Sequence, residues 1–232
     1  NKLGIKYYVF NFEDDFENEV IERFVNAYEE GMTPNPCIDC NRYIKFKRLY
    51  QRAKELGQDY IVTGHYARVR FDEETGRYQL LKAVDKNKDQ SYVLYSITQD
   101  QLAHTIFPLG EMDDKEEVRR IAEEHGFINA RKRDSQDICF VPDGDYASFI
   151  TRYRGKDYPR GEFVDMDGEV LGEHKGIIKY TIGQRKGLGL ALKEPMYVCE
   201  KNIIDNKVIL GRNEDLFKKE FEACDFNWIA CE

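Results

Sequence analysis

Residues Thr33–Asn41 read TPNPCIDCN, and this stretch organises the fold around it. Each proline fixes its own φ and biases the preceding residue toward extended geometry, so a stiff loop is expected here. A basic amphipathic run follows, which predicts a helix that begins at Cys37 and Cys40. A thiolate at a helix N-terminus is stabilised by free amide N–H groups and by the helix dipole. The stretch therefore predicts two thiols placed for chemistry.

The segment before this loop reads as a strand followed by a helix. Tyr7–Phe12 has the apolar character of a buried strand, and the acidic residues Glu13–Asp15 favour a helix start. Apolar residues then recur at helical spacing, and Gly31 is a plausible stop. The apolar residues of this helix are Val20, Ile21, Phe24, Val25 and Tyr28.

The segment after the loop reads as a helix followed by a strand. The inner face of the helix is predicted from Ile44, Leu49, Ala53 and Leu56, and Gly57 ends it. Asp59–Thr63 is then a short strand that leads into Gly64 and His65. Strand, helix, thiol loop, helix and strand in this order predict an α/β domain with a parallel sheet. Ligands of such sheets bind beyond the C-terminal strand ends, where Gly64 and His65 would lie.

Further along, the pattern predicts a hairpin, loops and shorter helices. Arg68–Phe71 and Tyr78–Lys82 flank a turn sequence, and the polar loop Lys86–Tyr92 opens a short helix. Helices are expected over Lys115–His125, with Gly126 as its C-cap, and over Tyr146–Tyr153. Between them the polar loop 133–140 ends on a lone thiol, Cys139.

From Gly155 onward short strands alternate with glycine-rich turns, which predicts a small β-rich module. Its strands are expected at 162–165, 169–172, 197–201 and 207–210, and a further strand at 221–228. The predicted domains are 1–153 (α/β), 154–213 (the β-rich domain) and 214–232 (the start of a β-barrel). A lone strand does not fold by itself, so we expect the barrel to be truncated here.

Composition and charge limit the classes of protein to which this chain could belong. The chain has 232 residues, 41% of them hydrophobic, and a net charge of −8, which argues against nucleic acid only on average. Basic clusters at 42–54, 152–156 and 175–186 are local faces that could bind phosphate, although solvated helix faces are the commoner explanation. No apolar run reaches the length of a membrane helix, so no membrane partner is expected. Six cysteines without an export signal predict reduced thiols and a cytoplasmic location.

The C-x-x-C pair has several chemical interpretations. A structural zinc site needs about four ligands and the chain has one such pair, while a thioredoxin motif is not preceded by two prolines. An iron–sulfur cluster on Cys37, Cys40 and Cys139 stays open, because three thiolates can hold a cluster. The polar neighbours of Cys139 favour a functional thiol over a packing residue. His65 is balanced between a hydrogen-bonded structural role and a functional one.

Five stretches together resemble the tRNA-specific 2-thiouridylase (MnmA/TrmU) family. They are Gly31–Asn41, Thr63–Arg68, Lys88–Tyr92, Asp134–Phe140 and Tyr180–Gly189, in family order and across nearly the whole chain. The resemblance implies a PP-loop α/β domain, a small central domain and a C-terminal β-barrel. It also implies the reaction: ATP, with Mg²⁺, adenylates the wobble uridine of tRNA, and a cysteine persulfide then delivers sulfur to carbon 2.

The resemblance also implies roles for individual residues. Cys139 would carry the persulfide, and Cys40 would be the partner nucleophile that attacks the persulfide or forms a disulfide with Cys139. Gly64 would contact ATP. The residues expected around the target base are Asn35, Pro36, Cys37 and His65, and those expected to touch tRNA are Lys88, Asp89 and Gln90. A protein that donates persulfide sulfur would be a further partner. Arg42 and Lys45 are expected to lower the pKa of Cys40.

Two departures from the family pattern limit what this chain is expected to do alone. The Ser-Gly-Gly-x-Asp-Ser pyrophosphate loop of the family would precede Asn1, and most of the barrel would follow Glu232. We therefore expect an inner fragment that does not adenylate uridine by itself. Two alternatives remain: a tRNA thiolase that depends on an iron–sulfur cluster, and a non-catalytic tRNA-binding fragment.

Overall fold

The computed structural model describes residues 4–132 and 138–231, which form two compact units. Unit 1 contains residues 4–21, 36–132 and 225–231, and unit 2 contains residues 22–35 and 138–224. The predicted domain boundaries at 153/154 and 213/214 stay predictions. No helix of the described residues is both long and apolar enough to cross a membrane.

One long helical segment of unit 1 begins directly at the thiol loop. It runs through α3 (Pro36–Asp39), η2 (Cys40–Leu49) and α4 (Tyr50–Glu55), and the chain leaves it at Gly57, whose φ is +68°. Proline suits the first helical turn because its missing N–H has no helical acceptor there. The prediction that a helix begins at the cysteines is confirmed.

The buried face of this helix differs from the predicted one. Asn41, Phe46 and Tyr50 are buried, whereas Leu56 is 42% exposed. Asn41 and Phe46 are five residues apart, and Phe46 and Tyr50 are four apart. This spacing fits the wide π-helical turns of η2, which place different residues on the buried face than an α-helix would. The inner face deduced from α-helical spacing was therefore wrong in part.

One of the two sheets described in unit 1 is a short parallel strand pair. β1 (Ile61–Val62) pairs with β4 (Thr105–Ile106), with Ile61 opposite Thr105. The predicted strand after the thiol helix and its parallel pairing are confirmed. Three short helical turns surround the pair: η3 (Ser91–Leu94), α5 (Gln99–Ala103) and η4 (Pro108–Glu111). The core comprises Phe46, Tyr50, Ile61, Ala67, Val93, Leu94, Ile97, Leu102 and Phe107.

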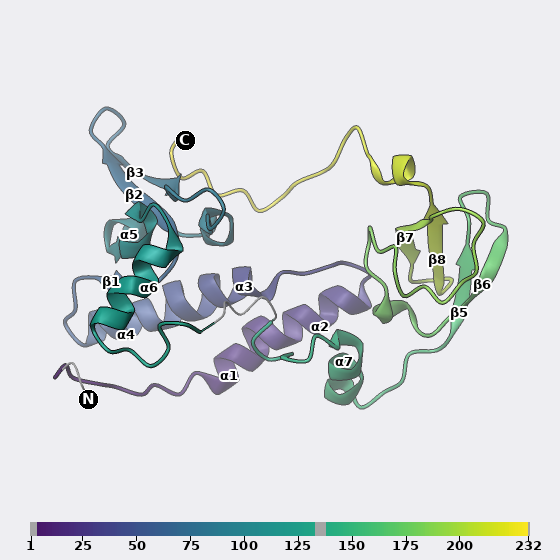
Figure 1. Ribbon diagram of the computed structural model, residues 1–232, viewed down its shortest axis with the longest axis horizontal. Coiled ribbons are helices and arrows are strands. Elements are labelled where there is room, and N and C mark those ends of the chain that lie inside the picture. Colours follow the sequence, from purple (N-terminus) through teal and green to yellow (C-terminus); the bar gives the residue numbers. More distant parts are fainter. Residues whose placement is uncertain (1–3, 133–137, 232) are drawn as a thin grey trace. The chain divides into compact units, whose positions relative to one another are not determined.

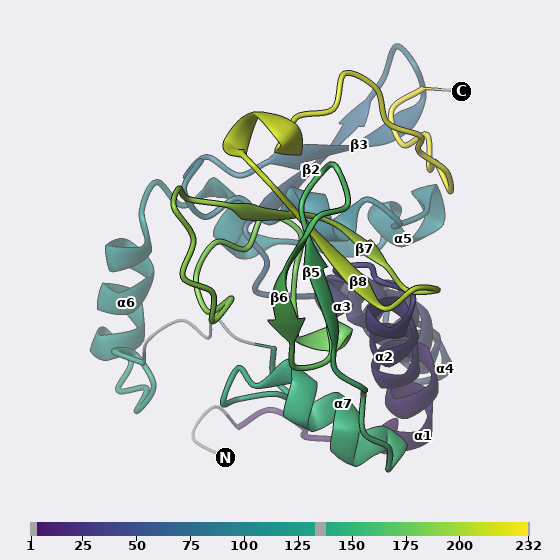
Figure 2. The same ribbon diagram turned by 90° about the vertical axis from the view of Figure 1, so that its right-hand side faces the viewer.

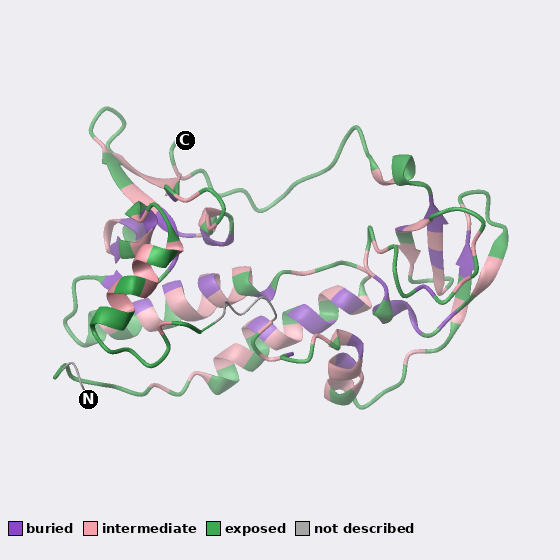
Figure 3. Cartoon of the chain, viewed as in Figure 1, coloured by how far each residue is buried: buried purple, intermediate pink, exposed green. Residues whose placement is uncertain are grey.

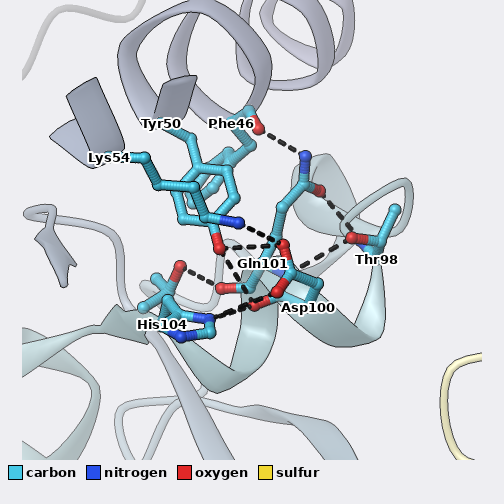
Figure 4. Close-up of polar contacts among 8 residues, drawn as sticks. Phe46, Tyr50, Lys54, Thr98, Asp100, Gln101 and His104 are labelled. Atoms are coloured by element: carbon cyan, nitrogen blue, oxygen red, sulfur yellow. Dashed lines mark hydrogen bonds and ion pairs between the residues drawn. The ribbon is translucent and has the colours of Figure 1, made fainter. Parts of the chain in front are cut away.

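Polar contacts fix the thiol helix to α5 (Figure 4). The Tyr50 hydroxyl and the Lys54 ammonium each donate to the Asp100 carboxylate at 2.9 Å. Gln101, whose side chain also closes the capping box with Thr98, donates to the carbonyl oxygen of Phe46. These bonds join the middle and the C-terminal part of the thiol helix to α5.

The predicted hairpin and the helix after it are both present in unit 1 (Figure 1). β2 (Ala67–Asp72) pairs antiparallel with β3 (Arg77–Lys82). α6 (Lys115–Glu124) is capped by Asp114, whose side chain accepts from the amides of residues 116 and 117, and it ends at Gly126, with φ +68°. Unit 1 also holds α1 (Glu13–Phe16) and η1 (Glu17–Ile21).

Unit 2 begins with a helix pair. α2 (Glu22–Glu29) ends near Gly31 as predicted, and α7 (Tyr146–Arg154) ends at Gly155 in the left-handed conformation. Phe24 is fully buried, and its ring packs edge-on against Phe140, Tyr146 and Phe149.

The rest of unit 2 is the predicted β-rich module, a four-stranded sheet in the order β6-β5-β8-β7 (Figure 2). Its strands are β5 (Gly161–Val164), β6 (Val170–His174), β7 (Tyr197–Asn202) and β8 (Lys207–Gly211). β5 and β8 are parallel and the other pairs are antiparallel. Phe163, Val198, Val208 and Leu210 form its fully buried interior. Short helical turns cover Ile177–Lys179 (η5) and Asn213–Leu216 (η6).

Two predicted strands are absent from the described residues. Residues 7–12 and 221–228 lack strand structure, and most of their apolar side chains are exposed (Figure 3): Tyr7 is 83% exposed and Phe221 89%. Apolar alternation specifies a strand only where a neighbouring strand supplies hydrogen bonds, and neither stretch pairs with one among the described residues. The general fold class, a mixed α/β protein with a parallel pair and a separate β-rich module, is confirmed.

Candidate functional site

The first turns of the thiol helix present both cysteines of the C-x-x-C pair in unit 1. Pro36 is buried, Cys37 is exposed and Cys40 is half-buried. Asn35, the residue before the helix, is exposed and belongs to unit 2. The amides of the first helical turn point along the helix axis toward the loop, so this end carries positive potential.

The two cations expected beside Cys40 have other partners. The Arg42 guanidinium lies 2.5 Å from the Asp225 carboxylate, and this contact raises the pKa of Arg42. Lys45 lies close enough to His65 to disfavour a charge on that imidazole. Arg42 and Lys45 thus have other neighbours besides Cys40, which lies in the second turn of the helix.

His65 is buried directly after β1. It is 9% exposed, Nδ1 is hydrogen-bonded to the Thr63 hydroxyl at 2.8 Å, and the ring packs near Phe46 and Phe107. Burial, together with Lys45, lowers the pKa of His65 to about 4. The imidazole is therefore neutral at physiological pH, and it can donate or accept a hydrogen bond without carrying charge.

Gly64 offers an open backbone position at the end of β1. The residue is exposed, and a Cβ added to it would meet only the Leu109 side chain, at an ordinary 3.7 Å. The C-terminal ends of parallel strands are where ligands approach an α/β sheet. The position thus fits a nucleotide that approaches the backbone of Gly64.

The loop expected to touch tRNA uses two of its three side chains internally. The carboxylate of Asp89 accepts from the Ala83 amide at 2.9 Å and from the Ser91 hydroxyl at 2.8 Å. The side-chain oxygen of Gln90 accepts from the Tyr66 amide at 3.0 Å. Lys88 is half-buried and lies close enough to Lys115 to help lower the pKa of that lysine.

Lys115 and Asn41 are site residues that sequence reasoning missed. Burial, Lys88 and Arg119 all lower the pKa of Lys115, and Glu116 opposes them, so Lys115 has both basic and acidic neighbours where α6 begins. Asn41 is 1% exposed, and its side chain donates to the Val93 carbonyl at 3.3 Å. A lysine just after an N-cap aspartate is a weak signal, and nothing in the pattern marked Asn41 as a link between elements.

Cys139, the predicted sulfur carrier, lies in unit 2 and is exposed. Most of the loop before it, residues 133–137, lies outside the described residues. Cys40 and Cys37 lie in unit 1, so the pairing of Cys40 with Cys139 stays a prediction. Among the described residues, no three His, Cys, Asp or Glu side chains form a group that could hold a metal ion.

The basic cluster at 152–156 is engaged within unit 2. Arg154 makes ion pairs with Glu22 at 2.8 Å and Glu29 at 3.0 Å, and Lys156 pairs with Glu29 at 2.6 Å. These contacts join α7 to α2, and they leave little uncompensated positive charge on Arg154 and Lys156. A structural role explains this cluster better than phosphate binding does.

Comparison with known proteins matches two parts of the chain to family models. Residues 1–143 match the family model described as the tRNA methyl transferase HUP domain, and residues 147–212 match the tRNA methyl transferase PRC-barrel domain. The chain belongs to this family. The resemblance deduced from the five sequence stretches is thereby confirmed.

Curated relatives match the chain from end to end. A tRNA-specific 2-thiouridylase MnmA of Clostridioides difficile is 52% identical over 232 residues, 100% of this chain and 64% of that protein. MnmA 1 of Thermoanaerobacter pseudethanolicus is 51% identical, with the same coverage. MnmA of Solibacter usitatus is 50% identical over 99% of this chain and 63% of its own length. The chain thus spans less than two thirds of the length of these relatives.

Proposed function

We propose that this chain forms the thiol-bearing part of an ATP-dependent sulfurtransferase that converts the wobble uridine of tRNA to 2-thiouridine. The observation that carries the proposal is the arrangement in unit 1, where Cys40 lies in the helix whose Phe46 packs near the neutral imidazole of His65. An RNA base needs uncharged hydrogen-bonding groups and apolar neighbours, and a sulfur transfer needs a thiolate beside it. The names of the curated relatives point to the same reaction.

The proposed chemistry has three steps. The O2 atom of the uridine attacks the α-phosphorus of ATP, supplied with Mg²⁺, and pyrophosphate leaves. The terminal sulfur of a Cys139 persulfide then attacks carbon 2, and AMP leaves with the original oxygen. The Cys40 thiolate attacks the inner sulfur of Cys139 and breaks the persulfide bond, which yields a Cys40–Cys139 disulfide. A thiol reductant restores the two cysteines, and a sulfur-donor protein recharges Cys139.

Four groups of unit 1 support this assignment. The helix N-terminus favours the thiolate of Cys40, Gly64 leaves room for the nucleotide, and His65 stays neutral near the base. Lys88 and Lys115 lie near each other, and their ammonium groups would suit the phosphate backbone. Asn35, Pro36 and Cys37 would border the base from the loop that precedes Cys40.

The test measures 2-thiouridine formation on unmodified tRNA with ATP and a persulfide donor, in protein of the same length as the curated relatives. Cys40→Ser and Cys139→Ser should each abolish thiolation, and Cys199→Ser, a half-buried thiol on β7, should retain it. Cys37→Ser tests the loop thiol separately. Thiolation at the normal rate by Cys139→Ser would reject the proposed sulfur carrier.

Iron and sulfide analysis of anaerobically purified protein tests the alternative in which Cys37, Cys40 and Cys139 hold a cluster. The proposed mechanism predicts full turnover without bound iron. Iron at about four atoms per chain, lost together with activity on chelation, would replace the persulfide mechanism with a cluster-dependent one.

A further inference from the structure

The loop from Asp89 to Val93 contacts three parts of unit 1 at once. It lies between the strand end that carries His65, the hairpin β2–β3 and the helix that carries Cys40. Every one of these links is a hydrogen bond to a backbone group. Such bonds restrain the positions of main-chain segments more directly than contacts between side chains do.

The first link joins Gln90 to Tyr66, the residue after His65. The Gln90 side-chain oxygen accepts from the Tyr66 amide at 3.0 Å, and the Gln90 amide donates to the Tyr66 carbonyl at 2.8 Å. Tyr66 is 8% exposed, so its peptide has little access to water that could replace these partners. One residue thereby satisfies both backbone polar groups of Tyr66, the residue after His65.

The second and third links fix the two ends of the loop. Asp89 accepts from the amide of Ala83, just after β3, and from the hydroxyl of Ser91. At the other end, the Val93 amide donates to the Gln90 carbonyl at 3.3 Å, and the Val93 carbonyl accepts from the buried Asn41 amide. Asn41 directly follows Cys40, so the chain of bonds runs from the His65 segment to the thiol helix.

We propose that Gln90 is a positioning residue that sets the distance between the His65 segment and the Cys40 helix. Lys88, whose RNA contact the family resemblance implies, serves as the reference for direct contact. The inference rests on the proposed function, since it assigns roles within the same site. The Asp89 carboxylate would repel phosphate, and it is already held by Ala83 and Ser91. Lys88 carries the positive charge that suits a phosphate, whereas the side-chain oxygen of Gln90 is engaged by the Tyr66 amide.

Substitution at Gln90 separates positioning from direct RNA contact. Gln90→Glu keeps the acceptor for the Tyr66 amide and adds a negative charge, whereas Gln90→Ala removes the acceptor. A positioning residue is rescued by glutamate. A residue that touches phosphate is harmed more by glutamate than by alanine. Lys88→Ala is the control for RNA contact.

The first measurement is hydrogen exchange of the Tyr66 amide in this chain, which needs no catalysis. Gln90→Ala should speed exchange about five- to tenfold, as expected for the loss of one partly buried hydrogen bond, and Gln90→Glu should stay within about twofold of the parent. Unchanged exchange in Gln90→Ala would overturn the proposal, whether or not the protein thiolates tRNA.

The second measurement uses an anticodon stem-loop RNA that carries the unmodified wobble uridine. Gln90→Ala should bind it within about threefold of the parent chain, while Lys88→Ala should bind more weakly and show a smaller salt dependence. Stronger loss of affinity in Gln90→Glu than in Gln90→Ala would assign Gln90 to direct phosphate contact and reject the positioning role.

The third measurement is thiolation kinetics in protein of the relatives' length. Gln90→Ala should lower kcat by roughly tenfold with KM little changed, Gln90→Glu should recover most of kcat, and Lys88→Ala should mainly raise KM. A purely structural residue would lower the active fraction without this rescue pattern. Equal loss of kcat in both Gln90 variants, with intact protein, would contradict the proposal.

Discussion

The Asp225 carboxylate lies 2.5 Å from the Arg42 guanidinium, so a segment close to the end of the chain is fastened to the helix that carries Cys40. The backbone around it is fastened as well. Asn227 donates to the carbonyls of Tyr95 and Ile97, and Arg77 donates to those of Trp228 and Ile229. The Asp225 carboxylate therefore pairs with the Arg42 guanidinium, which could otherwise bind an anion.

Replacing Asp225 should release Arg42 for RNA. Both side chains are partly exposed, 33% for Arg42 and 57% for Asp225, so the ion pair contributes only about 0.2–1 kcal/mol to stability. Asp225→Asn should thus fold normally and bind an anticodon stem-loop a few-fold more tightly at low salt, with the gain vanishing at high salt. Fluorescence anisotropy of labelled RNA measures both affinities.

Glu194→Gln is the matched control for Asp225→Asn. Glu194 is an exposed carboxylate of unit 2 that pairs with Arg212 at 2.9 Å, so its loss changes net charge by the same amount. It should leave RNA affinity nearly unchanged. Equal tightening in both variants would show that total charge, not Arg42, governs binding.

Burial of His65 should make unit 1 less stable in acid. Because the folded pKa is about 4 and the unfolded value about 6.5, the unfolded chain binds the proton first as pH falls. Stability is then fully present above pH 6.5 and declines toward pH 4, by about 3 kcal/mol in total. His65→Asn should flatten this decline in urea unfolding followed by a unit 1 signal.

His104→Asn provides the histidine control, because His104 is a more exposed residue of the same unit, with a side chain 38% exposed. It should retain the acid decline of the parent chain. A decline equally steep in His65→Asn would mean that other groups cause the loss of stability.

Lys201 should destabilise unit 2 at neutral pH. Its ammonium is largely buried, donates to the Tyr180 carbonyl at 3.0 Å and lies over the Tyr28 ring, and burial lowers its pKa to about 8. The charge is disfavoured in the folded state, so the penalty is fully present below pH 8 and disappears as pH rises toward 10.5.

Lys201→Met should therefore raise the stability of unit 2 at pH 7 by about 1–2 kcal/mol, after allowance for the lost hydrogen bond to Tyr180. The advantage should shrink between pH 8 and 10.5. Lys207→Met, which removes an exposed lysine paired with Glu162 on the neighbouring strand, should give no such gain. Thermal unfolding monitored on unit 2 measures both; destabilisation by Lys201→Met at pH 7 would refute the argument.

The sequence predicted local elements well wherever proline, glycine and turn residues agreed with the spacing of the apolar residues. Pro36 and Gly57 marked the two ends of the thiol helix, and the turn at 72–77 marked the hairpin. In contrast, residues 7–12 and 221–228 had strand-like patterns, but strand formation depends on neighbours that a local pattern does not contain. The π-helical turns of η2 likewise moved the buried face onto Phe46 and Tyr50, which α-helical spacing did not predict.

The residues of the candidate site could be predicted from the sequence, but the hydrogen bonds that connect them could not. Cys40, Gly64 and His65 follow recognisable signals, a helix start and a strand end. The internal use of Asp89 and Gln90 was not predictable, because a polar loop looks the same whether its side chains face RNA or its own backbone. Tertiary hydrogen bonds decide between the two.

Gly64 separates the effect of a side chain on folding from its effect on nucleotide binding. A Cβ at this position meets only Leu109, at 3.7 Å, and the backbone does not need a left-handed conformation. Gly64→Ala should therefore change stability by less than about 1 kcal/mol. The proposed approach of ATP to the Gly64 backbone predicts a large loss of nucleotide affinity in the same variant.

Gly110→Ala is the opposite case in the same unit. Its Cβ would overlap the Ala67 carbonyl oxygen, a backbone atom that cannot move aside, so this variant should lose several kcal/mol of stability. Isothermal titration with ATP and urea unfolding of both variants, in protein of the relatives' length, give the two readouts. Because Gly64→Ala is expected to fold normally, unchanged ATP affinity in that variant would rule out a close approach of the nucleotide to Gly64.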